Sequence, residues 1–155
     1  ITNKKVLEYV PQKDQYSVKY NFIKYFYEHV GLDTRIYVEY FDIPSTDISR
    51  ELYNTVIDKK IIFTHTKASI REINLLPKLT KYINDPEYIV ICANKNLYGS
   101  GHLTEKFVNI PIAHYIDVIK NAHLIEVIDS CFSCIVYPLI LKCVIDKEIV
   151  TIHDR

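Results

Sequence analysis

Methionine is absent from this sequence, glycine occurs only three times, and neither sign of charge predominates. Because a translated chain needs an initiator, we expect a piece excised from a longer protein. Lysine plus arginine number 19, as do aspartate plus glutamate, so no overall field favours a nucleic-acid partner. No apolar run approaches the roughly 20 residues of a membrane-spanning helix, and nothing resembles a signal peptide. We therefore predict no nucleic-acid and no membrane partner.

The usual phosphate-binding and metal-binding motifs are missing too. No G-x-G-x-x-G opens a helix, no P-loop occurs, and Gly99–Gly101 is a bare G-x-G within a polar loop. Aspartates at D-x-D spacing are absent, and Cys131-x-x-Cys134 lacks the second half of a zinc knuckle. The sequence predicts no metal and no cofactor. With Cys92 and Cys143, these cysteines are expected to be free thiols in a reducing compartment, which indicates the cytoplasm.

From residue 59 onward, short apolar runs alternate with segments of helical spacing. Runs that are apolar at every position are typical of parallel strands covered on both faces. The sequence therefore predicts an α/β, Rossmann-like fold with a mostly parallel sheet and helices on both faces. The strands are expected at 61–64, 88–92, 107–110 and 124–128, with closing strand material at 142–145 and 149–152, and the helices at 70–79, 114–121 and from 130.

The residues before this core are expected to form a lead-in, so that 1–155 is one domain with a lead-in over 1–58 and a nucleotide-binding core over 59–155. Aromatic residues at helical spacing, stopped by Gly31, predict a helix over 16–30. Alternation of β-branched and aromatic residues predicts a strand over 35–41. A short strand is expected over 6–10, and a helix capped by Ser45-Thr46-Asp47 through residue 57.

The strand predicted over 124–128 runs through Asp129 into a helix that starts at Ser130. A helix start carries unpaired N–H groups and the positive end of the helix dipole, so it suits an anion. The hydroxyls of Ser130 and Ser133 add donors there, although an ordinary N-cap explains them equally well. In such sheets the ligand lies outside the carboxyl ends of the strands, so the loops after Thr64, Cys92 and residue 128 should converge.

The run NAHLIEVIDSCFS, residues 121–133, resembles a segment in the donor-binding half of GT-B glycosyltransferases. FYEHVGLD, YFDIP and IIFTHTKASIREI, upstream of it, are similar to segments of sugar transferases from large DNA viruses and bacteria. The resemblance spans residues 26–155. It implies one half of a GT-B fold that binds a nucleotide-sugar donor for transfer to a glycan or another hydroxyl acceptor. It also implies a missing domain of the same chain and, for a viral protein, a location in the host cytoplasm.

The resemblance also assigns site residues, while the catalytic residues stay unknown. Ser130 and Ser133 would hold the donor diphosphate, and Asp129 would orient their loop. Arg71 would neutralise charge on the departing nucleotide. A metal-free site of this kind stabilises the leaving group with a helix dipole, hydroxyls and a cation. The remaining implied donor contacts are His65, Thr66 and Ser69 near the phosphates or sugar, and residues 112–115, with His114, near the base and ribose.

Two departures from the family pattern and several alternatives bear on this assignment. Thr66 stands where the family has an aspartate, and Cys131 stands where it has a second serine. His65 also fits a histidine with a satisfied hydrogen bond, Arg71 a solvated helix residue, and His114 a cap after Pro111. Alternative functions are a non-catalytic interaction or assembly domain and a nucleotide-sugar-modifying enzyme such as an epimerase. A serine hydrolase is disfavoured because Ser130 lacks the flanking glycines of a nucleophile elbow.

Overall fold

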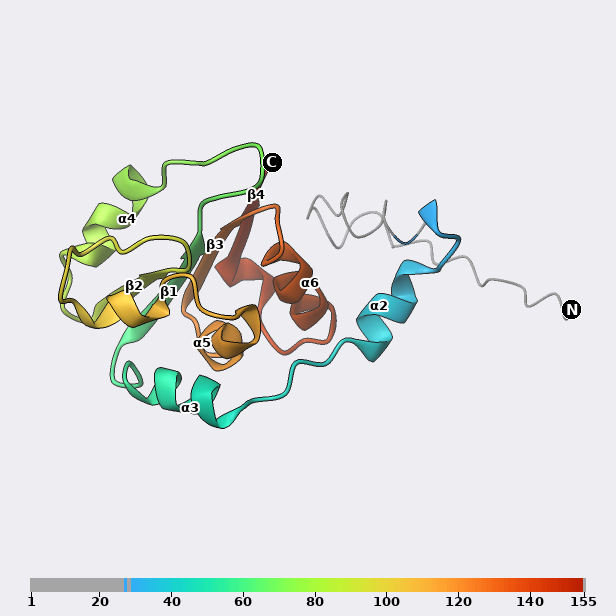
Figure 1. Ribbon diagram of the computed structural model, residues 1–155, viewed down its shortest axis with the longest axis horizontal. Helices are drawn as coiled ribbons and strands as arrows, with labels where there is room; N and C mark the ends of the chain where they lie inside the picture. The colour runs from blue at the N-terminus through green and yellow to red at the C-terminus, as the bar shows by residue number, and fades with distance from the viewer. Residues whose placement is uncertain (1–26, 28, 155) are drawn as a thin grey trace, which may run out of the picture. The chain divides into compact units, whose positions relative to one another are not determined.

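The computed structural model describes residue 27 and residues 29–154, and the chain divides into two compact units, 1–42 and 43–155. The second unit is built on a four-stranded sheet in which all neighbouring strands are parallel, in the order β2-β1-β3-β4 (Figure 1). The predicted α/β, Rossmann-like fold is thereby confirmed. The strands are β1 (Lys60–His65), β2 (Tyr88–Cys92), β3 (Leu124–Ile128) and β4 (Val150–His153).

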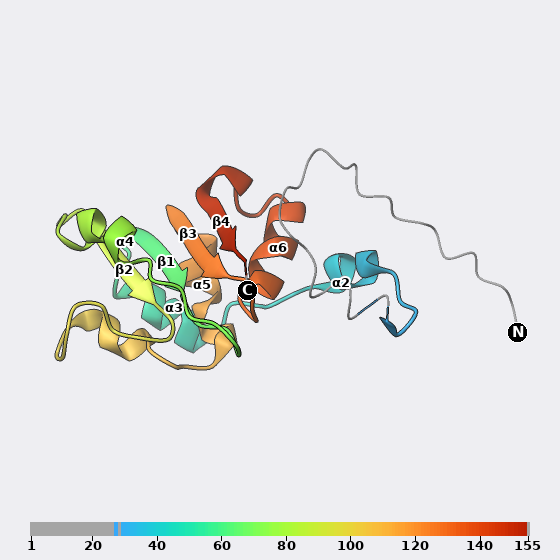
Figure 2. The same ribbon diagram turned by 90° about the horizontal axis from the view of Figure 1, so that it is seen from above.

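Helices cover both faces of this sheet, as the apolar strands predicted (Figures 1 and 2). The chain leaves β1 for β2 in one direction and then returns past β1 to β3 and β4, so crossovers of one hand place their helices on opposite faces. The helix α4 (Leu76–Ile83) lies on one face; α5 (Ile116–Lys120) and α6 (Ser133–Leu141) lie on the other, with α3 (Asp47–Asn54) packed on α5. Short 3₁₀ helices η1 (Leu103–Phe107), η2 (Ile112–Tyr115) and η3 (Lys147–Ile149) complete the unit.

The two faces have different cores. On the α4 face, Ile62 and Val90 pack against Leu79 of α4. On the opposite face, Phe63 lies with its ring centroid 5.6 Å from Tyr115 and 5.2 Å from Phe132, so three aromatic rings fill the space between sheet and helices. Such aromatic contacts add roughly 0.5–1.5 kcal/mol each beyond burial of their area. We therefore call these the α4 face and the aromatic face.

Two of the helices begin at signals that the sequence carries. Thr46 caps α3, since its hydroxyl accepts from the N–H of Ser49 while the Ser49 hydroxyl accepts from the N–H of Thr46. Pro77 lies in the first turn of α4, where a missing N–H costs nothing. The predicted helix from residue 70 was therefore wrong in its start, because α4 begins at Leu76 with Pro77 in its first turn.

The strand predicted over 35–41 was wrong, because these residues form the helix α2 (Thr34–Tyr40) of the first unit. Asp33 caps this helix by accepting from the N–H of Arg35 at 2.8 Å, and its carboxylate also pairs with the Arg35 guanidinium at 2.9 Å. These bonds hold the pKa of Asp33 below its usual value. Alternation alone favours a strand, but a strand also needs a neighbour, whereas a capped helix satisfies its backbone locally.

Two other predicted strands were also wrong, and both contain a residue in the left-handed region. Phe107 is the last residue of η1, and residues 108–110 turn at Asn109, which has a φ of 56° and donates its N–H to the Ala93 carbonyl. Residues 142–145 close the end of α6 around Cys143, with a φ of 55°. The apolar side chains that suggested strands include Phe107 and Ile145, which are buried from η1 and from the turn after α6 instead.

The predicted helix over 16–30 lies almost entirely outside the described residues, as does the strand predicted over 6–10. The expected end of this helix is confirmed, because Gly31 adopts a φ of 72°, a conformation that favours glycine directly after a helix. None of the described helices is long and apolar enough to cross a lipid bilayer.

Candidate functional site at the carboxyl edge of the sheet

The order of the strands places a topological switch point between β1 and β3. The chain passes from β1 to β2 on one side of β1 and later returns to β3 on its other side. The loops after β1 and β3 therefore start side by side and depart toward opposite faces. In open parallel sheets this is where ligands bind.

His65 and Ser130 meet at this switch point. His65 is the last residue of β1, Ser130 lies two residues beyond β3, and the His65 Nδ1 is 3.0 Å from the Ser130 Oγ. The imidazole also packs on the Phe132 ring with centroids 4.7 Å apart. The two residues are 65 positions apart in the chain, and both were predicted site residues. The structure thus brings together the two loops that the sequence assigned to one site.

The imidazole of His65 is kept neutral by its surroundings. It is nearly buried between the end of β1 and Phe132, and this loss of hydration lowers its pKa from 6.5 to about 4. A neutral imidazole carries one N–H and one lone pair. At neutral pH His65 therefore acts as a hydrogen-bonding group and not as a cation for a phosphate.

Ser133, by contrast, has its hydroxyl engaged within the loop. The Oγ lies 2.7 Å from both the Asp129 carboxylate and the Ser130 carbonyl, and it accepts from the N–H of Ser130 at 3.2 Å. These bonds tie residues 129–133 into a compact turn before α6. The Ser130 carbonyl takes the N–H groups of Ser133 and Cys134, while those of Cys131 and Phe132 donate no backbone hydrogen bond within the described part of the chain.

The loop after β1 holds the other predicted donor contacts. Its two arms face each other, since Lys67 and Glu72 form an antiparallel bridge and Ile73 donates its N–H to the Thr66 carbonyl at 2.9 Å. Thr66 is buried and exchanges hydrogen bonds with the Asn94 side chain, which joins this loop to the one after β2. The predicted convergence of these two loops is confirmed.

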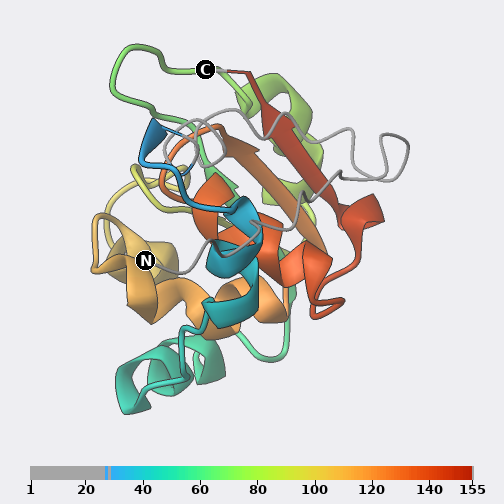
Figure 3. The same cartoon turned by 90° about the vertical axis from the view of Figure 1, so that its right-hand side faces the viewer.

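Ser69 and Arg71 are exposed on the same loop. The Arg71 guanidinium lies 3.5 Å from the Asp154 carbonyl, so the loop reaches across the sheet edge to the end of β4 (Figures 1 and 3). His114 lies in η2, and none of its side-chain contacts connects it to His65 or Ser130 in the described part of the chain. The structure thus places Arg71 at the edge and leaves His114 apart from the His65–Ser130 pair.

Sequence reasoning missed a charged cluster on the α4 face. Glu126 is completely buried in the middle of β3, and its carboxylate contacts the Lys78 ammonium of α4 and lies 2.7 Å from the His153 Nε2 at the end of β4. A glutamate within an otherwise apolar strand is the signal that was available. A buried carboxylate needs partners, but the residues around it in the sequence do not identify them.

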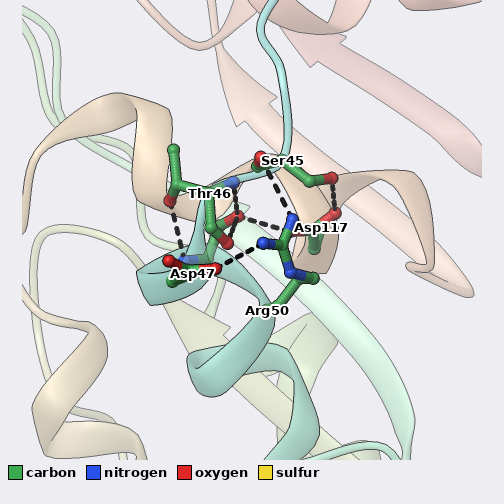
Figure 4. Close-up of polar contacts among 6 residues, drawn as sticks. Ser45, Thr46, Asp47, Arg50 and Asp117 are labelled. Carbon is green, nitrogen blue, oxygen red and sulfur yellow. Dashed lines mark hydrogen bonds and ion pairs between the residues drawn. The ribbon is translucent and has the colours of Figure 1, made fainter.

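A second buried carboxylate, Asp117 of α5, lies on the helical side of the aromatic face. It accepts hydrogen bonds from the hydroxyls of Ser45 and Ser49 and so fastens the start of α3 to α5 (Figure 4). Arg50 turns away from it to pair with Asp47 at 2.5 Å and to donate to the Ser45 carbonyl. This cluster satisfies its own members, so we interpret it as a structural fastening.

The chemistry of the edge follows from these groups. Neutral hydrogen-bonding groups lie at its centre, the cations Lys67 and Arg71 are exposed on the neighbouring loop, and the start of α6 contributes the positive end of its dipole. Cys134 is a weak nucleophile, since burial raises the pKa of its thiol to about 11. The edge is therefore suited to bind a polar, hydroxyl-bearing molecule that carries phosphate at one end.

Fold and site together define an α/β protein with a Rossmann-like parallel sheet and polar groups gathered at its switch point. No family model, curated protein or solved structure matches this chain.

Proposed function

We propose that this chain binds a nucleotide sugar at the carboxyl edge of its sheet and forms the donor-binding part of a metal-independent glycosyltransferase. The observation that carries the proposal is the meeting of His65 with Ser130 at the switch point, at 3.0 Å. This position is where a Rossmann-like sheet binds its ligands. The sugar-transfer part of the proposal rests on the resemblance of residues 121–133 and of the loop after β1.

The geometry supports distinct roles for the groups at the edge. The N–H groups of Cys131 and Phe132, with the dipole of α6, supply donors for a phosphate. Ser130 and His65 supply hydroxyl and imidazole partners for the neutral part of the ligand. Arg71 is the cation whose loop lies beside the end of β4. Ser133, bonded within its turn, shapes the site in this proposal and contacts no ligand.

The Asp129 carboxylate limits where a phosphate can lie. It accepts from the Ser133 hydroxyl at 2.7 Å and stands at the start of the same turn. A phosphate placed beside it is repelled by a like charge, so the phosphate belongs nearer to Cys131 and the Arg71 loop. The sugar or ribose then lies toward Asp129, whose carboxylate can accept from hydroxyls.

A thermal-shift panel with UDP, GDP, dTDP, CMP and their sugars tests the proposal. A ligand at 100 times its dissociation constant adds about 2.7 kcal/mol to the free energy of unfolding, which raises the melting temperature of a domain of this size by about 5–11 °C. We expect Ser130→Ala to reduce this shift, because it removes a hydroxyl from the switch point. The matched control is Ser100→Ala, an exposed serine in the loop between Gly99 and Gly101.

The outcomes separate the candidate functions. A shift for one nucleotide sugar that Ser130→Ala weakens and Ser100→Ala preserves supports the donor site and names the base. Binding that is equal in both variants moves the ligand away from the switch point. The absence of any shift contradicts the donor site and favours a non-catalytic interaction domain. Conversion of a nucleotide sugar without an acceptor favours an epimerase.

A further inference from the structure

The cluster on the α4 face contains a histidine whose orientation is fixed by a buried acid. Glu126 has no exposed surface, and both of its carboxylate oxygens are engaged: Oε1 by the Lys78 ammonium and Oε2 by the His153 Nε2 at 2.7 Å. Lys78 and His153 remain reachable from solvent, with 49% and 28% of their side chains exposed. The acid thus lies inside and holds two basic groups at the surface.

The carboxylate also determines which nitrogen of His153 carries the hydrogen. An ionised carboxylate only accepts, so the Nε2 facing it must donate. In the neutral imidazole the Nδ1 then has a free lone pair. Within the described part of the chain no hydrogen bond to this Nδ1 is formed. His153 therefore offers a hydrogen-bond acceptor that no described residue occupies.

The position of His153 relates this acceptor to the candidate site. Its carbonyl accepts from the N–H of Asp129 at 2.9 Å, directly before the Ser130 turn. The next residue, Asp154, accepts from Arg71 of the loop after β1. Through its backbone, His153 is thus connected to the turn that carries Ser130, and its neighbour Asp154 is connected to the loop that carries Arg71.

Polar side chains also lie near His153 on the α4 face of the sheet, where a face that only packs against a helix is expected to be apolar. On the α4 face, the register aligns Thr64 with Glu126 on one side and with Cys92 on the other. The Thr64 Oγ1 is buried and has no hydrogen-bond partner among the described residues. Buried polar groups without partners are uncommon in proteins. Burying the Thr64 hydroxyl and the Glu126 carboxylate thus costs free energy of folding, and packing alone does not explain why these groups are present.

We propose that His153 is a ligand-contacting residue of the carboxyl edge, which accepts a hydrogen bond from a hydroxyl of the bound nucleotide sugar, and that Glu126 positions it. This inference rests on the proposed function, since it assumes a ligand at this edge. The hydroxyl belongs either to the ribose or to the transferred sugar. Both are secondary alcohols, and both present the same O–H to the Nδ1.

Two substitutions separate the two nitrogens of His153. His153→Gln places an amide donor near the former Nε2, so it can keep the bond to Glu126 while the Nδ1 acceptor is lost. His153→Asn places an amide oxygen near the former Nδ1, so it can keep the acceptor and lose the bond to Glu126. A merely structural role of His153 predicts that only the second substitution is harmful. A role in ligand contact predicts that only the first abolishes recognition of the hydroxyl.

Affinities measured by calorimetry on the full chain test the inference. The probes are UDP, GDP, CDP and ADP, each compared with its 2′-deoxy and 3′-deoxy forms and with UDP-glucose, GDP-mannose or ADP-glucose where these exist. One hydrogen bond corresponds to about a five- to ten-fold difference in the dissociation constant. We expect the wild-type chain and His153→Asn to show this preference for one hydroxyl, and His153→Gln to lose it.

The comparison of probes identifies the source of the hydroxyl. Loss of discrimination between ribo and deoxy forms assigns the contact to the ribose. Loss of the extra affinity of the nucleotide sugar over its diphosphate assigns it to the sugar. If His153→Gln binds nucleotide and keeps every preference of the wild type, the inference is overturned while the proposed function stands. If the wild-type chain binds none of the probes, both are overturned.

Discussion

The two sides of the sheet each bury one carboxylate and place one histidine at a strand end, but they stabilise them in opposite ways. On the α4 side, Glu126 is held by the Lys78 ammonium and by the Nε2–H of His153. On the aromatic side, Asp117 is held by the neutral hydroxyls of Ser45 and Ser49. His65, on the aromatic face of the sheet, faces a serine hydroxyl and an aromatic ring.

The difference shows that a buried carboxylate can be held either by a cation or by neutral hydrogen-bond donors. The Glu126 carboxylate is paired with an ammonium, whereas His65 beside Phe132 and Ser130 stays neutral. The α4 side should therefore depend on charge, and the aromatic side on hydrogen bonds and packing. The following substitutions are chosen to break or to sharpen this contrast.

The largest effect is expected from Lys78→Met, which removes a cation from a carboxylate that has no exposed surface. Removal of one partner from a buried pair costs about 3–5 kcal/mol, and because His153 still contacts Glu126 we expect about 2–3 kcal/mol. Urea denaturation at neutral pH measures the change. The control is Lys147→Met, whose ammonium pairs loosely with Glu148 at the surface, 3.8 Å away, and whose loss should cost less than about 0.5 kcal/mol. Equal losses in the two variants would show that Glu126 is not held by charge.

Glu126 also shows how far the sequence alone can predict this molecule. Apolar runs predicted three strands at nearly their observed bounds, and the meeting of the segment after β3 with the end of β1 followed from the parallel sheet. The helix predicted from Ser130 begins only at Ser133, after a turn. The partners of Glu126 lie on α4 and β4, which become neighbours of β3 only through the strand order and the register. Local periodicity predicts neither the strand order nor the register, so the sequence alone does not relate His153 or Lys78 to Glu126.

The strand predicted over 35–41 failed for the opposite reason. Its residues have high strand propensity, yet the local cap at Asp33 and the pair with Arg35 decide in favour of a helix. Propensity for a strand describes how well a residue fits beside other strands. Where no strand pairs with the segment, local hydrogen bonds prevail.

The second expected effect concerns the neutral histidine of the aromatic face. Because its folded pKa, about 4, lies below the unfolded value of 6.5, the unfolded chain binds more protons between these two pH values. The free energy of unfolding should therefore fall as the pH is lowered from 6.5 to 4. The full pKa difference corresponds to about 3 kcal/mol, and partial access of solvent reduces our expectation to about 2 kcal/mol.

Denaturation at a series of pH values, in the wild type and in His65→Asn, measures this contribution. Asparagine does not titrate and can still face Ser130, so the variant should lose about 2 kcal/mol less than the wild type between pH 6.5 and 4. His123→Asn, at an exposed position before β3, is the control and should follow the wild-type profile. Parallel profiles for all three proteins would mean that His65 is as accessible to protons as a surface histidine.

The smallest effect is expected from Ser45→Ala, which removes one of the two hydroxyls that hold Asp117. Ser45 is chosen over Ser49 because Ser49 also belongs to the cap of α3, so its loss would mix two causes. A hydrogen bond to a charged group contributes about 1.5–3 kcal/mol, and the half-buried position of Ser45 admits water in its place. We therefore expect Ser45→Ala to lower the free energy of unfolding by about 1 kcal/mol, measured by urea denaturation.

The dependence of these losses on salt distinguishes the two sides of the sheet. The loss in Lys78→Met should shrink in 1 M NaCl, where the Debye length is about 3 Å, because the ammonium is half exposed. The loss in Ser45→Ala should not change, since a neutral hydroxyl is not screened. A salt-dependent loss in Ser45→Ala would contradict the contrast between the two sides.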